Sequence, residues 1–538
     1  MSTDSSTGRE AVESQGTPAG SQSPRIADLV AAAGGQPSAP ALVVSSDRTP
    51  VSYGDLARLA DQVAKQLRKG GLLPGERVGL RAGSNAEFVV ALLAASRAEL
   101  IVVPLDPALP VSEQRTRVEA AGARVVLVDG EGHDDRREPA LRCWPIAVTV
   151  GRDGGSHERA VEVSVDAATP PAQGVSAPEG LRDGDAMIMF TGGTTGVPKM
   201  VPWTHQNIAG SVRAVIAGYG LGPRDAPVAV MPLYHGHGLI AGLLATLASG
   251  GTVLLPARRR FSAHTFWDDI AAVRATWYTA VPTIHQILLD RAETEQPPNG
   301  RTALRFIRSC SAPLTAETAQ ALRAAFSAPV VSAFGMTEAT HQVATTSVGH
   351  GENAAATPGL VGRSTGPDIR IVGPDGQPLP AEGVGEVWLR GPTVVRGYLG
   401  DPAITAANFT DGWLRTGDLG SLSAAGDLTI RGRIKELINR GGEKISPEHV
   451  EGVLASHPNV LEVAVFGLPD KMYGETVAAV IVPRKAPAPT PGELAVFCRE
   501  RLAAFEVPAA FEEASALPHT AKGSLDRRAV AEQFGRGA

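Results

Sequence analysis

The sequence predicts an α/β protein with a large N-terminal domain of α/β sheet subdomains, a β-rich subdomain and a small α+β C-terminal domain. At 538 residues the chain is too long for a single hydrophobic core. Between residues 26 and 128, helical patterns alternate with short apolar runs, which is typical of a parallel sheet covered by helices. After Thr357 short strands with Gly- and Pro-containing turns follow, which indicates β-rich structure.

The spacing of apolar residues predicts the individual helices and strands. Apolar residues at helical intervals predict helices at residues 56–67, 87–98 and 446–456. Apolar or alternating runs predict strands at residues 77–80, 100–105, 124–128, 385–391 and 460–466. Residues 150–182 are polar and rich in Gly, Pro and Ala, so we expect them to form a connection, with the α/β pattern running from Met187 to about Val331.

Composition excludes several classes of protein. The net charge of −6 gives no electrostatic reason to expect nucleic acid or an anionic membrane as partner. The three cysteines are scattered, which argues against a disulfide framework or a metal cluster and favours the cytoplasm. Residues 1–24 are polar and expected to be a disordered extension without a signal peptide, and no apolar run is long enough to span a membrane.

The segment from Phe190 to Lys199 carries the strongest chemical signal. Glycines let successive backbone N–H groups converge on an anion, threonine hydroxyls add donors, and a lysine adds a mobile charge. The residues predicted to bind the phosphates of a nucleotide are Thr191, Gly192, Gly193, Thr194, Thr195, Gly196 and Lys199. The spacing is not that of the P-loop of common NTPases. The alternative interpretation is a flexible surface loop without a ligand.

This segment resembles the phosphate-binding signature of the AMP-forming adenylating superfamily, which includes acyl-CoA synthetases, luciferase and adenylation domains of peptide synthetases. The family signature ends in Pro-Lys-Gly, whereas Met200 stands here in place of the last glycine. The resemblance covers nearly all of the chain. It implies an N-terminal AMP-binding domain at residues 25–431, a hinge at 432–436 and a mobile lid domain at 437–538.

Further motifs carry the same resemblance in the same order. The segment Phe334-Gly335-Met336-Thr337-Glu338 resembles the family's Tyr-Gly-Met-Thr-Glu motif. An aromatic face can cover adenine, Thr337 can donate to the α-phosphate, and Glu338 is a hard oxygen ligand suited to Mg²⁺ on ATP.

Three more segments complete the implied nucleotide and thiol sites. Asp418, in a Thr-Gly-Asp motif, and Arg433 resemble the family's ribose contacts, and Lys435 resembles its hinge residue. The loop carrying Ser311 and Ala312 resembles the one that borders adenine. The family's coenzyme A tunnel corresponds to Gly441, Gly442 and Glu443, where glycines would leave room for a narrow thiol channel.

The acid-binding pocket is expected between residues 231 and 286, a region that looks most like the oxalyl-CoA synthetase branch. A small dicarboxylate needs donors or cations deep in its pocket. The predicted substrate-binding residues are His235, His237, His285 and Ser311, with one of Arg258, Arg259 or Arg260 as a possible cation. For each histidine the alternative is a core or surface imidazole without a ligand.

One departure concerns the lid. The family ends with a motif whose lysine reaches the carboxylate and the α-phosphate, but Ser524 occupies that position here. Lys522 lies two residues earlier, about 6.6 Å away along an extended chain. We expect Lys522 to replace the missing lysine in part.

The resemblance implies an acyl-CoA synthetase that uses ATP, Mg²⁺ and coenzyme A, with the carboxylate substrate itself attacking ATP. A small polar acid such as oxalate is favoured. The alternatives are a fatty-acid–CoA ligase, an acyl-AMP ligase that loads a carrier protein or an amine, and a catalytically impaired relative that binds adenylate. The sequence does not determine the oligomeric state.

Overall fold

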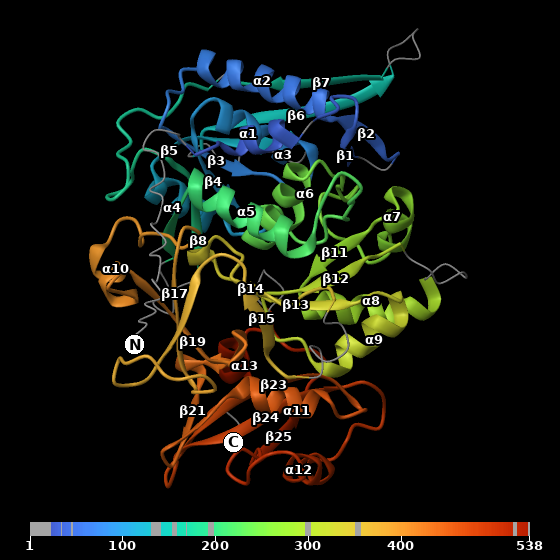
Figure 1. Cartoon of the computed structure of the whole chain (residues 1–538), viewed down its shortest axis with the longest axis vertical. Coiled ribbons are helices and arrows are strands. Elements are labelled where there is room, and N and C mark those ends of the chain that lie inside the picture. Colours follow the sequence, from blue (N-terminus) through green and yellow to red (C-terminus); the bar gives the residue numbers. More distant parts are fainter. Residues whose placement is uncertain are drawn as a thin grey trace, which may run out of the picture.

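The computed structural model describes residues 23–33, 35–44, 47–130, 141–152, 159–167, 169–191, 198–295, 303–349, 357–519 and 525–535. In Figure 1 the blue and green N-terminal elements lie at the top, the yellow and orange strands lie in the middle, and the orange to red C-terminal elements lie at the bottom. The predicted fold class is confirmed, because helices and sheets alternate in the N-terminal part and a smaller α+β unit follows.

A seven-stranded sheet with the order β7-β6-β5-β3-β4-β8-β9 organises the N-terminal part. Its strands are β3 (Arg77–Arg81), β4 (Ile101–Leu105), β5 (Ala123–Asp129), β6 (Cys143–Arg152), β7 (Arg159–Val165), β8 (Asp185–Thr191) and β9 (Lys199–Thr204). The helices of this part are α1 (Ile26–Ala33), α2 (Tyr53–Lys69), α3 (Ala86–Arg97), α4 (Val111–Ala121) and α5 (His205–Tyr219). Strands β3, β4, β5 and β8 are parallel, as the alternating pattern predicted. Every residue of β4 is buried, since α3 and α4 both pack against this strand.

Helix α2 shows how local signals place an element. The Ser52 hydroxyl accepts a hydrogen bond from the Asp55 amide and caps the N-terminus. Leu56, Leu59 and Val63 recur at helical spacing and are all buried. The predicted helix at 56–67 is therefore confirmed and extends by a turn at its start.

One prediction for this region is wrong in part. Residues 150–182 were expected to form a connection, but β6 and β7 pair there as an antiparallel hairpin. In β7, Val161, Val163 and Val165 alternate with polar residues and pack against the core. The alternation is a strand signal that the polar composition around it obscured.

The second sheet has ten strands and joins the α/β and β-rich parts. Its order is β11-β12-β13-β14-β15-β20-β19-β17-β16, with β18 beside β19. The strands are β11 (Trp277–Ala280), β12 (Phe306–Ser309), β13 (Val330–Phe334), β14 (Ala344–Thr345), β15 (Leu360–Ser364), β16 (Asp368–Val372), β17 (Gly385–Arg390), β18 (Phe409–Thr410), β19 (Trp413–Leu422) and β20 (Asp427–Arg433). Because β13 pairs with β14, the parallel strands continue directly into the antiparallel ones. The β-rich part is therefore not a separate sheet.

The remaining elements of the N-terminal part surround these two sheets. The helices are η1 (His237–Leu244), α6 (Ala245–Ala248), α7 (Phe266–Val273), α8 (Pro282–Glu295), α9 (Ala316–Phe326), η2 (Thr337–Ala339) and α10 (Pro402–Asn408). A three-stranded sheet contains β1 (Pro40–Val44), β2 (Thr49–Ser52) and β10 (Val253–Leu254). The π-helical winding of η1 is a local irregularity of the kind that often occurs at functional sites.

The C-terminal unit has its own sheet, which follows the short helix η4 (Ile434–Glu436). Its strands are β21 (Ile438–Arg440), β22 (Glu443–Ile445), β23 (Val460–Asp470), β24 (Gly474–Pro483) and β25 (Ala510–Glu513). Its helices are α11 (Pro447–Ala455), α12 (Pro491–Arg499) and α13 (Arg527–Phe534). Two apolar clusters fill this unit, one containing Val450 of α11 and Leu494 of α12, the other Val530 of α13. The predicted helix at 446–456 and strand at 460–466 are confirmed as α11 and β23.

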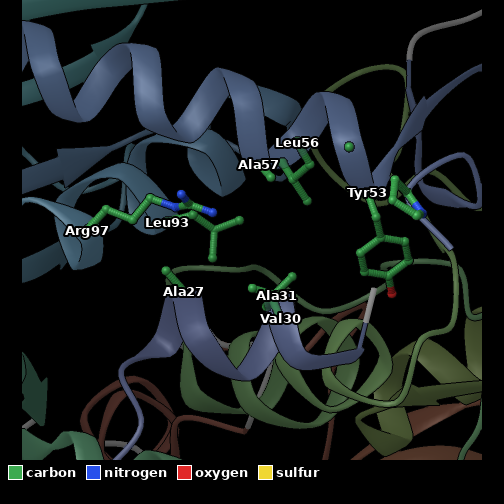
Figure 2. Close-up of a pocket in the computed structure, with 10 residues that line it drawn as sticks. Ala27, Val30, Ala31, Tyr53, Leu56, Ala57, Leu93 and Arg97 are labelled. Carbon is green, nitrogen blue, oxygen red and sulfur yellow. The ribbon is translucent and has the colours of Figure 1, made fainter. Parts of the chain in front are cut away.

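A small apolar cavity between α1 and α2 is shown in Figure 2. Its volume is about 140 Å³, and its lining includes Ala27, Val30, Leu56 and Leu93. None of the residues predicted to bind nucleotide or acid lines it. Among the described helices, none is both long and apolar enough to cross a membrane.

Candidate active site

The β8–β9 hairpin carries the two ends of the predicted phosphate loop. Thr191 ends β8, Lys199 begins β9, and the two residues pair across the hairpin. The described residues do not include Gly192, Gly193, Thr194, Thr195 and Gly196. The Thr191 hydroxyl is buried and has no hydrogen-bond partner in the described part of the chain. Because a buried hydroxyl without a partner is costly, a ligand oxygen beside it would be stabilised.

Tyr398 links Lys199 to Glu338. Lys199 Nζ lies 4.6 Å from the centre of the Tyr398 ring and donates a hydrogen bond of 3.4 Å to Asn408 Oδ1. The Tyr398 hydroxyl donates a hydrogen bond of 2.9 Å to Glu338 Oε1. A cation and a carboxylate are thus held by the ring and the hydroxyl of one side chain, which is the charge pattern that a metal–phosphate ligand requires.

The surroundings shift the pKa values of this group. Burial lowers the pKa of Lys199, and the charge of Lys435 acts in the same direction while Glu338 opposes it. Burial and the neighbouring Glu338 carboxylate raise the pKa of Tyr398, so its hydroxyl stays protonated and remains a donor. Sequence reasoning missed Tyr398, because no motif spacing connects it to either partner.

The turn after β13 fixes the predicted Phe334–Glu338 motif. A side chain at Gly335 would place its Cβ 1.6 Å from the backbone oxygen of His341, so only glycine fits. The Trp203 indole donates a hydrogen bond of 2.7 Å to the backbone oxygen of Thr337. Phe334 and Met336 both pack against the core of the β-rich strands. The motif is therefore a rigid strand end followed by the short helix η2.

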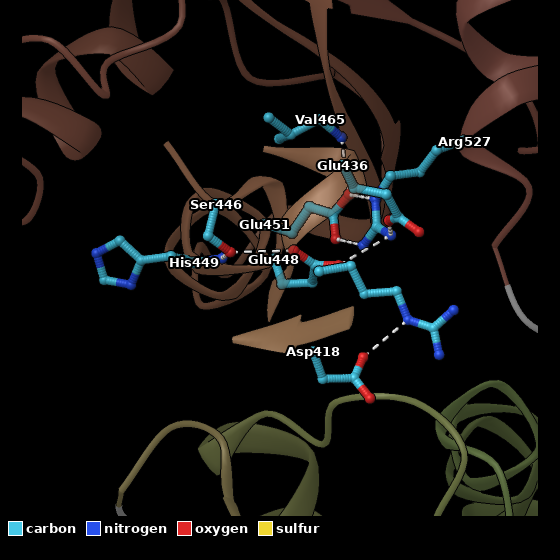
Figure 3. Close-up of polar contacts among 9 residues, drawn as sticks. Asp418, Glu436, Ser446, Glu448, His449, Glu451, Val465 and Arg527 are labelled. Atoms are coloured by element: carbon cyan, nitrogen blue, oxygen red, sulfur yellow. Dashed lines mark hydrogen bonds and ion pairs between the residues drawn. The ribbon is translucent and has the colours of Figure 1, made fainter. Parts of the chain in front are cut away.

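Asp418 and Arg433 face each other across β19 and β20, as directly paired residues. Arg433 Nε lies 3.0 Å from Asp418 Oδ1, the contact shown at the bottom of Figure 3. The other carboxylate oxygen of Asp418 is buried and has no partner among the described residues. Burial raises the pKa of Asp418 to about 6, although the Arg433 guanidinium opposes this shift. The structure thus brings the two predicted ribose contacts together.

This pKa leads to a prediction. If Asp418 accepts both ribose hydroxyl hydrogens, it does so as the anion, so the KM for ATP should rise as the pH falls through about 6. We expect an increase of about 10-fold between pH 7.5 and pH 5, measured by ATP–pyrophosphate exchange. Asp418→Asn should show a high KM for ATP with no such rise. If the KM for ATP rose equally in both proteins as the pH fell, the rise would come from protonation of ATP itself rather than of Asp418.

The predicted hinge residue Lys435 lies in η4, beside an ion-pair cluster around Arg527. Arg527 Nη1 lies 2.5 Å from Glu436 Oε2 and 3.1 Å from Glu448 Oε1, and Arg527 Nη2 lies 2.6 Å from Glu451 Oε2. Figure 3 shows these three carboxylates converging on one guanidinium. Because Arg527 begins α13, the cluster connects α13 to η4 and α11.

The loop in which Ser524 replaces the family lysine precedes Arg527. The described residues do not include Lys522 and Ser524. The two ends of this loop are close together, since His519 and Leu525 form an antiparallel bridge. The Asp526 amide also donates a hydrogen bond of 2.9 Å to the backbone oxygen of Pro518. The described residues that flank the loop are therefore held together next to the Arg527 cluster.

Gly441 and Gly442 lie in the turn between β21 and β22 rather than on a strand. Their φ angles are 62° and 96°, which a glycine adopts without a steric penalty. The prediction explained these glycines by the room they leave in a tunnel. The structure supplies a nearer reason, which is the turn itself. Glu443 begins β22 and is exposed.

His237 is the centre of the polar group at the predicted acid pocket. It begins η1 and is buried. Its Nδ1 lies 3.1 Å from the Ser311 hydroxyl, and its Nε2 lies 2.6 Å from the Thr279 hydroxyl. Ser311 is exposed and has a φ of 73°, next to the half-buried Ala312. Two of the predicted substrate-binding residues, His237 and Ser311, are thus in contact.

The other two predicted histidines are placed differently. His285 lies in α8, is fully buried, and its Nδ1 is 3.2 Å from the Tyr278 hydroxyl. Burial lowers its pKa to about 3, so the imidazole is neutral. His235 precedes η1, with its ring 4.7 Å from the Tyr234 ring in an edge-to-face contact. His285 makes no described hydrogen bond to His237 or Ser311.

The cation beside His237 is Arg308, a residue that sequence reasoning missed. The candidates Arg258 and Arg260 are exposed, and Arg259 forms an ion pair of 3.2 Å with Asp129. Arg308 lies on β12 and donates to His237 Nε2 at 3.1 Å. An arginine inside an apolar strand such as Phe306–Ser309 was the signal that could have identified it, because buried parallel strands rarely carry charge.

Comparison with known proteins identifies the family. Residues 29–399 match the family model of AMP-binding enzymes, and residues 449–524 match that of the AMP-binding enzyme C-terminal domain. The chain belongs to the AMP-binding enzyme family. It is 40% identical to an oxalate–CoA ligase of Arabidopsis thaliana, covering 91% of this chain and 94% of that protein. It is 34% identical to a sulfoacetate–CoA ligase of Cupriavidus necator, covering 93% of this chain and 96% of that protein.

A solved structure agrees with this family. ATP-bound MatB from Rhodopseudomonas palustris matches the fold with a TM-score of 0.80 at 28% identity, covering 95% of this chain and 99% of that one. This AMP-binding enzyme is therefore an AMP-forming acid–thiol ligase that uses ATP and coenzyme A, as predicted.

Magnesium is the usual ion of the family, and the residues present fit it. Within the described ranges no three His, Cys, Asp or Glu side chains are grouped to hold an ion. Glu338 offers one carboxylate beside Lys199, and Mg²⁺ typically binds one or two carboxylates together with substrate phosphates. When bound with ATP, the ion would offset negative charge on the phosphates.

Proposed function

We propose that this enzyme is a CoA ligase for a short dicarboxylate, with oxalate as the first candidate. The observation that carries this proposal is the polar group of His237, Thr279 and Arg308, which is buried at the predicted acid pocket. These side chains hydrogen-bond to one another and hold the positive charge of Arg308 in this region. An alkyl chain could not compensate that charge, whereas a second carboxylate could. The relatives named for oxalate and sulfoacetate support the proposal, because both acids are short and carry two acidic groups.

The first half-reaction joins the acid to AMP. A carboxylate oxygen attacks the α-phosphorus of ATP, a phosphorus–oxygen bond breaks, and pyrophosphate leaves. We assign Lys199 and Thr337 to the phosphates and Glu338 to the metal ion that accompanies ATP. The contacts among Lys199, Tyr398 and Glu338 support these roles, since they hold opposite charges at one place.

The rest of the nucleotide is assigned by the same motifs. Asp418 and Arg433 would hold the ribose, which their direct contact supports. The residues proposed to surround the adenine and the phosphates are Thr191, Gly192, Gly193, Thr194, Thr195, Gly196, Ser311, Ala312, Phe334, Gly335 and Met336.

The second half-reaction transfers the acyl group to coenzyme A. The thiolate attacks the acyl carbon of the acyl-AMP, and AMP leaves. We propose that residues 437–538 act as a lid that turns about Lys435 in the 432–436 hinge. The turn of Gly441 and Gly442, with Glu443, would then face the thiol channel. The lid's separate sheet and cores support this division from residues 25–431.

A substrate panel tests the proposed function. We expect kcat/KM for oxalate to exceed that for any saturated C12 to C16 acid by at least about 10-fold, because a long alkyl chain carries no second negative charge to compensate the buried Arg308. Pyrophosphate release with coenzyme A present is the measurement. A larger kcat/KM for a long-chain acid would contradict the dicarboxylate proposal and leave the ligase class unchanged.

A further inference from the structure

Arg308 is a buried cation whose donors are all used. It is 0% exposed on β12, and a guanidinium has five N–H donors. Each donor has one described acceptor. The five hydrogen bonds reach Tyr219 Oη at 2.9 Å, His237 Nε2 at 3.1 Å, Thr279 Oγ1 at 3.0 Å, His341 Nε2 at 3.2 Å and Gln342 Oε1 at 2.8 Å.

All five acceptors are neutral groups. Burial and the adjacent Arg308 charge hold the pKa values of His237 and His341 well below the ordinary value, so both imidazoles are uncharged. Among the described residues no carboxylate is hydrogen-bonded or ion-paired to Arg308. Buried charges in proteins are normally paired. The protein therefore holds one positive charge here with no described carboxylate against it, and the Tyr219 phenol and the Cys310 thiol are the acidic side chains that interact with this charge.

The bond from Arg308 to His237 also determines which atom donates in the next hydrogen bond, between His237 and Ser311. An arginine can only donate, so His237 Nε2 is an acceptor. The proton of this neutral imidazole is then on Nδ1, which donates to the Ser311 oxygen 3.1 Å away. Ser311 accepts that bond and keeps its own hydroxyl hydrogen for another acceptor.

The chain of contacts runs from the core to the pocket. Arg308 is fully buried, His237 is 4% exposed, and Ser311 is exposed in the loop after β12. Its last member thus offers a hydroxyl hydrogen at the surface of the predicted acid pocket. A carboxylate placed there would accept this hydrogen. It would also be attracted by the positive charge of Arg308, which lies two hydrogen bonds away through His237.

We propose that Arg308 is the positioning residue of this site. Its charge makes the site select a dianionic acid, and the orientation that it imposes on His237 and Ser311 directs a hydroxyl hydrogen to the bound acid. This inference rests on the proposed function. Arg308 has no free donor for the acid, so it acts through its neighbours and through its field.

The test compares an acid with its half-amide in the full-length enzyme. Oxalate and oxamate have nearly the same shape, but oxamate carries one charge fewer. We expect Arg308→Met to lower kcat/KM for oxalate by at least about 30-fold, mainly through KM, and that for oxamate by less than about 5-fold. The KM for ATP should not change. Equal losses for the two acids would overturn the proposal, because they would indicate only a structural role.

Three further variants keep the result interpretable if Arg308→Met folds poorly. Arg308→Lys retains the charge and should keep most of the oxalate preference. Ser311→Ala retains the charge but removes the hydroxyl, so both acids should weaken by a similar factor. Arg305→Met is the matched control, because Arg305 precedes the same strand and its charge is paired with Asp225 at 2.5 Å. It should leave the oxalate-to-oxamate ratio unchanged. The proposal would be overturned if Arg305→Met lost the preference for oxalate over oxamate, or if Arg308→Met kept it.

The failure of the proposed function can be distinguished from failure of this inference. If the wild type prefers malonate or succinate, oxalate is the wrong acid, and the same comparison with malonamate or succinamate decides the role of Arg308. If the wild type prefers acids with uncharged tails, the inference is overturned as well.

Discussion

Replacing Glu338 by glutamine is expected to lower the rate of ATP–pyrophosphate exchange by a factor on the order of 10²–10³. Glutamine has nearly the same shape and can still accept the hydrogen bond from the Tyr398 hydroxyl. Only the negative charge is lost, and with it the proposed metal ligand beside Lys199. The Mg²⁺ concentration that gives half-maximal rate should therefore rise by at least about 10-fold.

Two further variants distinguish the roles of Lys199 and Tyr398 from that of Glu338. Lys199→Ala should also lose exchange activity, by about 100-fold, because phosphate charge is no longer offset. Tyr398→Phe keeps the ring next to Lys199 and removes only the hydroxyl, so we expect a loss of less than about 10-fold. Glu317→Gln on α9, an exposed carboxylate, is the control and should behave as wild type. Normal exchange in Glu338→Gln at ordinary Mg²⁺ would remove Glu338 from the ATP site.

Replacing Lys522 by alanine is expected to separate the two half-reactions. Ser524 stands where the family has a lysine, and Lys522 is the cation nearest to it along the sequence. Loss of a cation that contacts developing phosphoryl charge costs about 3 kcal/mol, or about 150-fold in rate. We expect this loss in acyl-AMP formation. Thioester formation from acyl-AMP supplied ready-made should be nearly unchanged, since the lid would have turned this loop away.

The complementary change sharpens the test. Ser524→Lys restores the family residue, so it should accelerate adenylation and make Lys522 dispensable in the double variant. Lys522→Ala must fold normally, and its melting temperature checks this. Equal losses in both half-reactions would point to a folding defect, and no loss in either would show that adenylation proceeds without Lys522.

Much of the fold could be predicted because its signals are local. Apolar spacing within one segment marked α2, α3 and β4, and their burial confirms the prediction. The β7 strand was missed because its alternation covers only seven residues in a polar setting. The sequence interpretation of Gly441 and Gly442 considered only the room they leave in a thiol channel, whereas their two consecutive positive φ angles place them in a turn.

The sequence by itself determined the family, the order of its motifs and the residues that each motif contributes. Each motif is a short contiguous segment, so its chemistry can be recognised without knowing what it touches. Only the tertiary structure decided which side chains meet. Tyr398 lies far along the chain from Lys199 and Glu338, and Arg308 reaches His237 and His341 from a different strand. Such contacts depend on sheet order and on how η1 packs over the strands, and these long-range arrangements leave no spacing pattern in the chain.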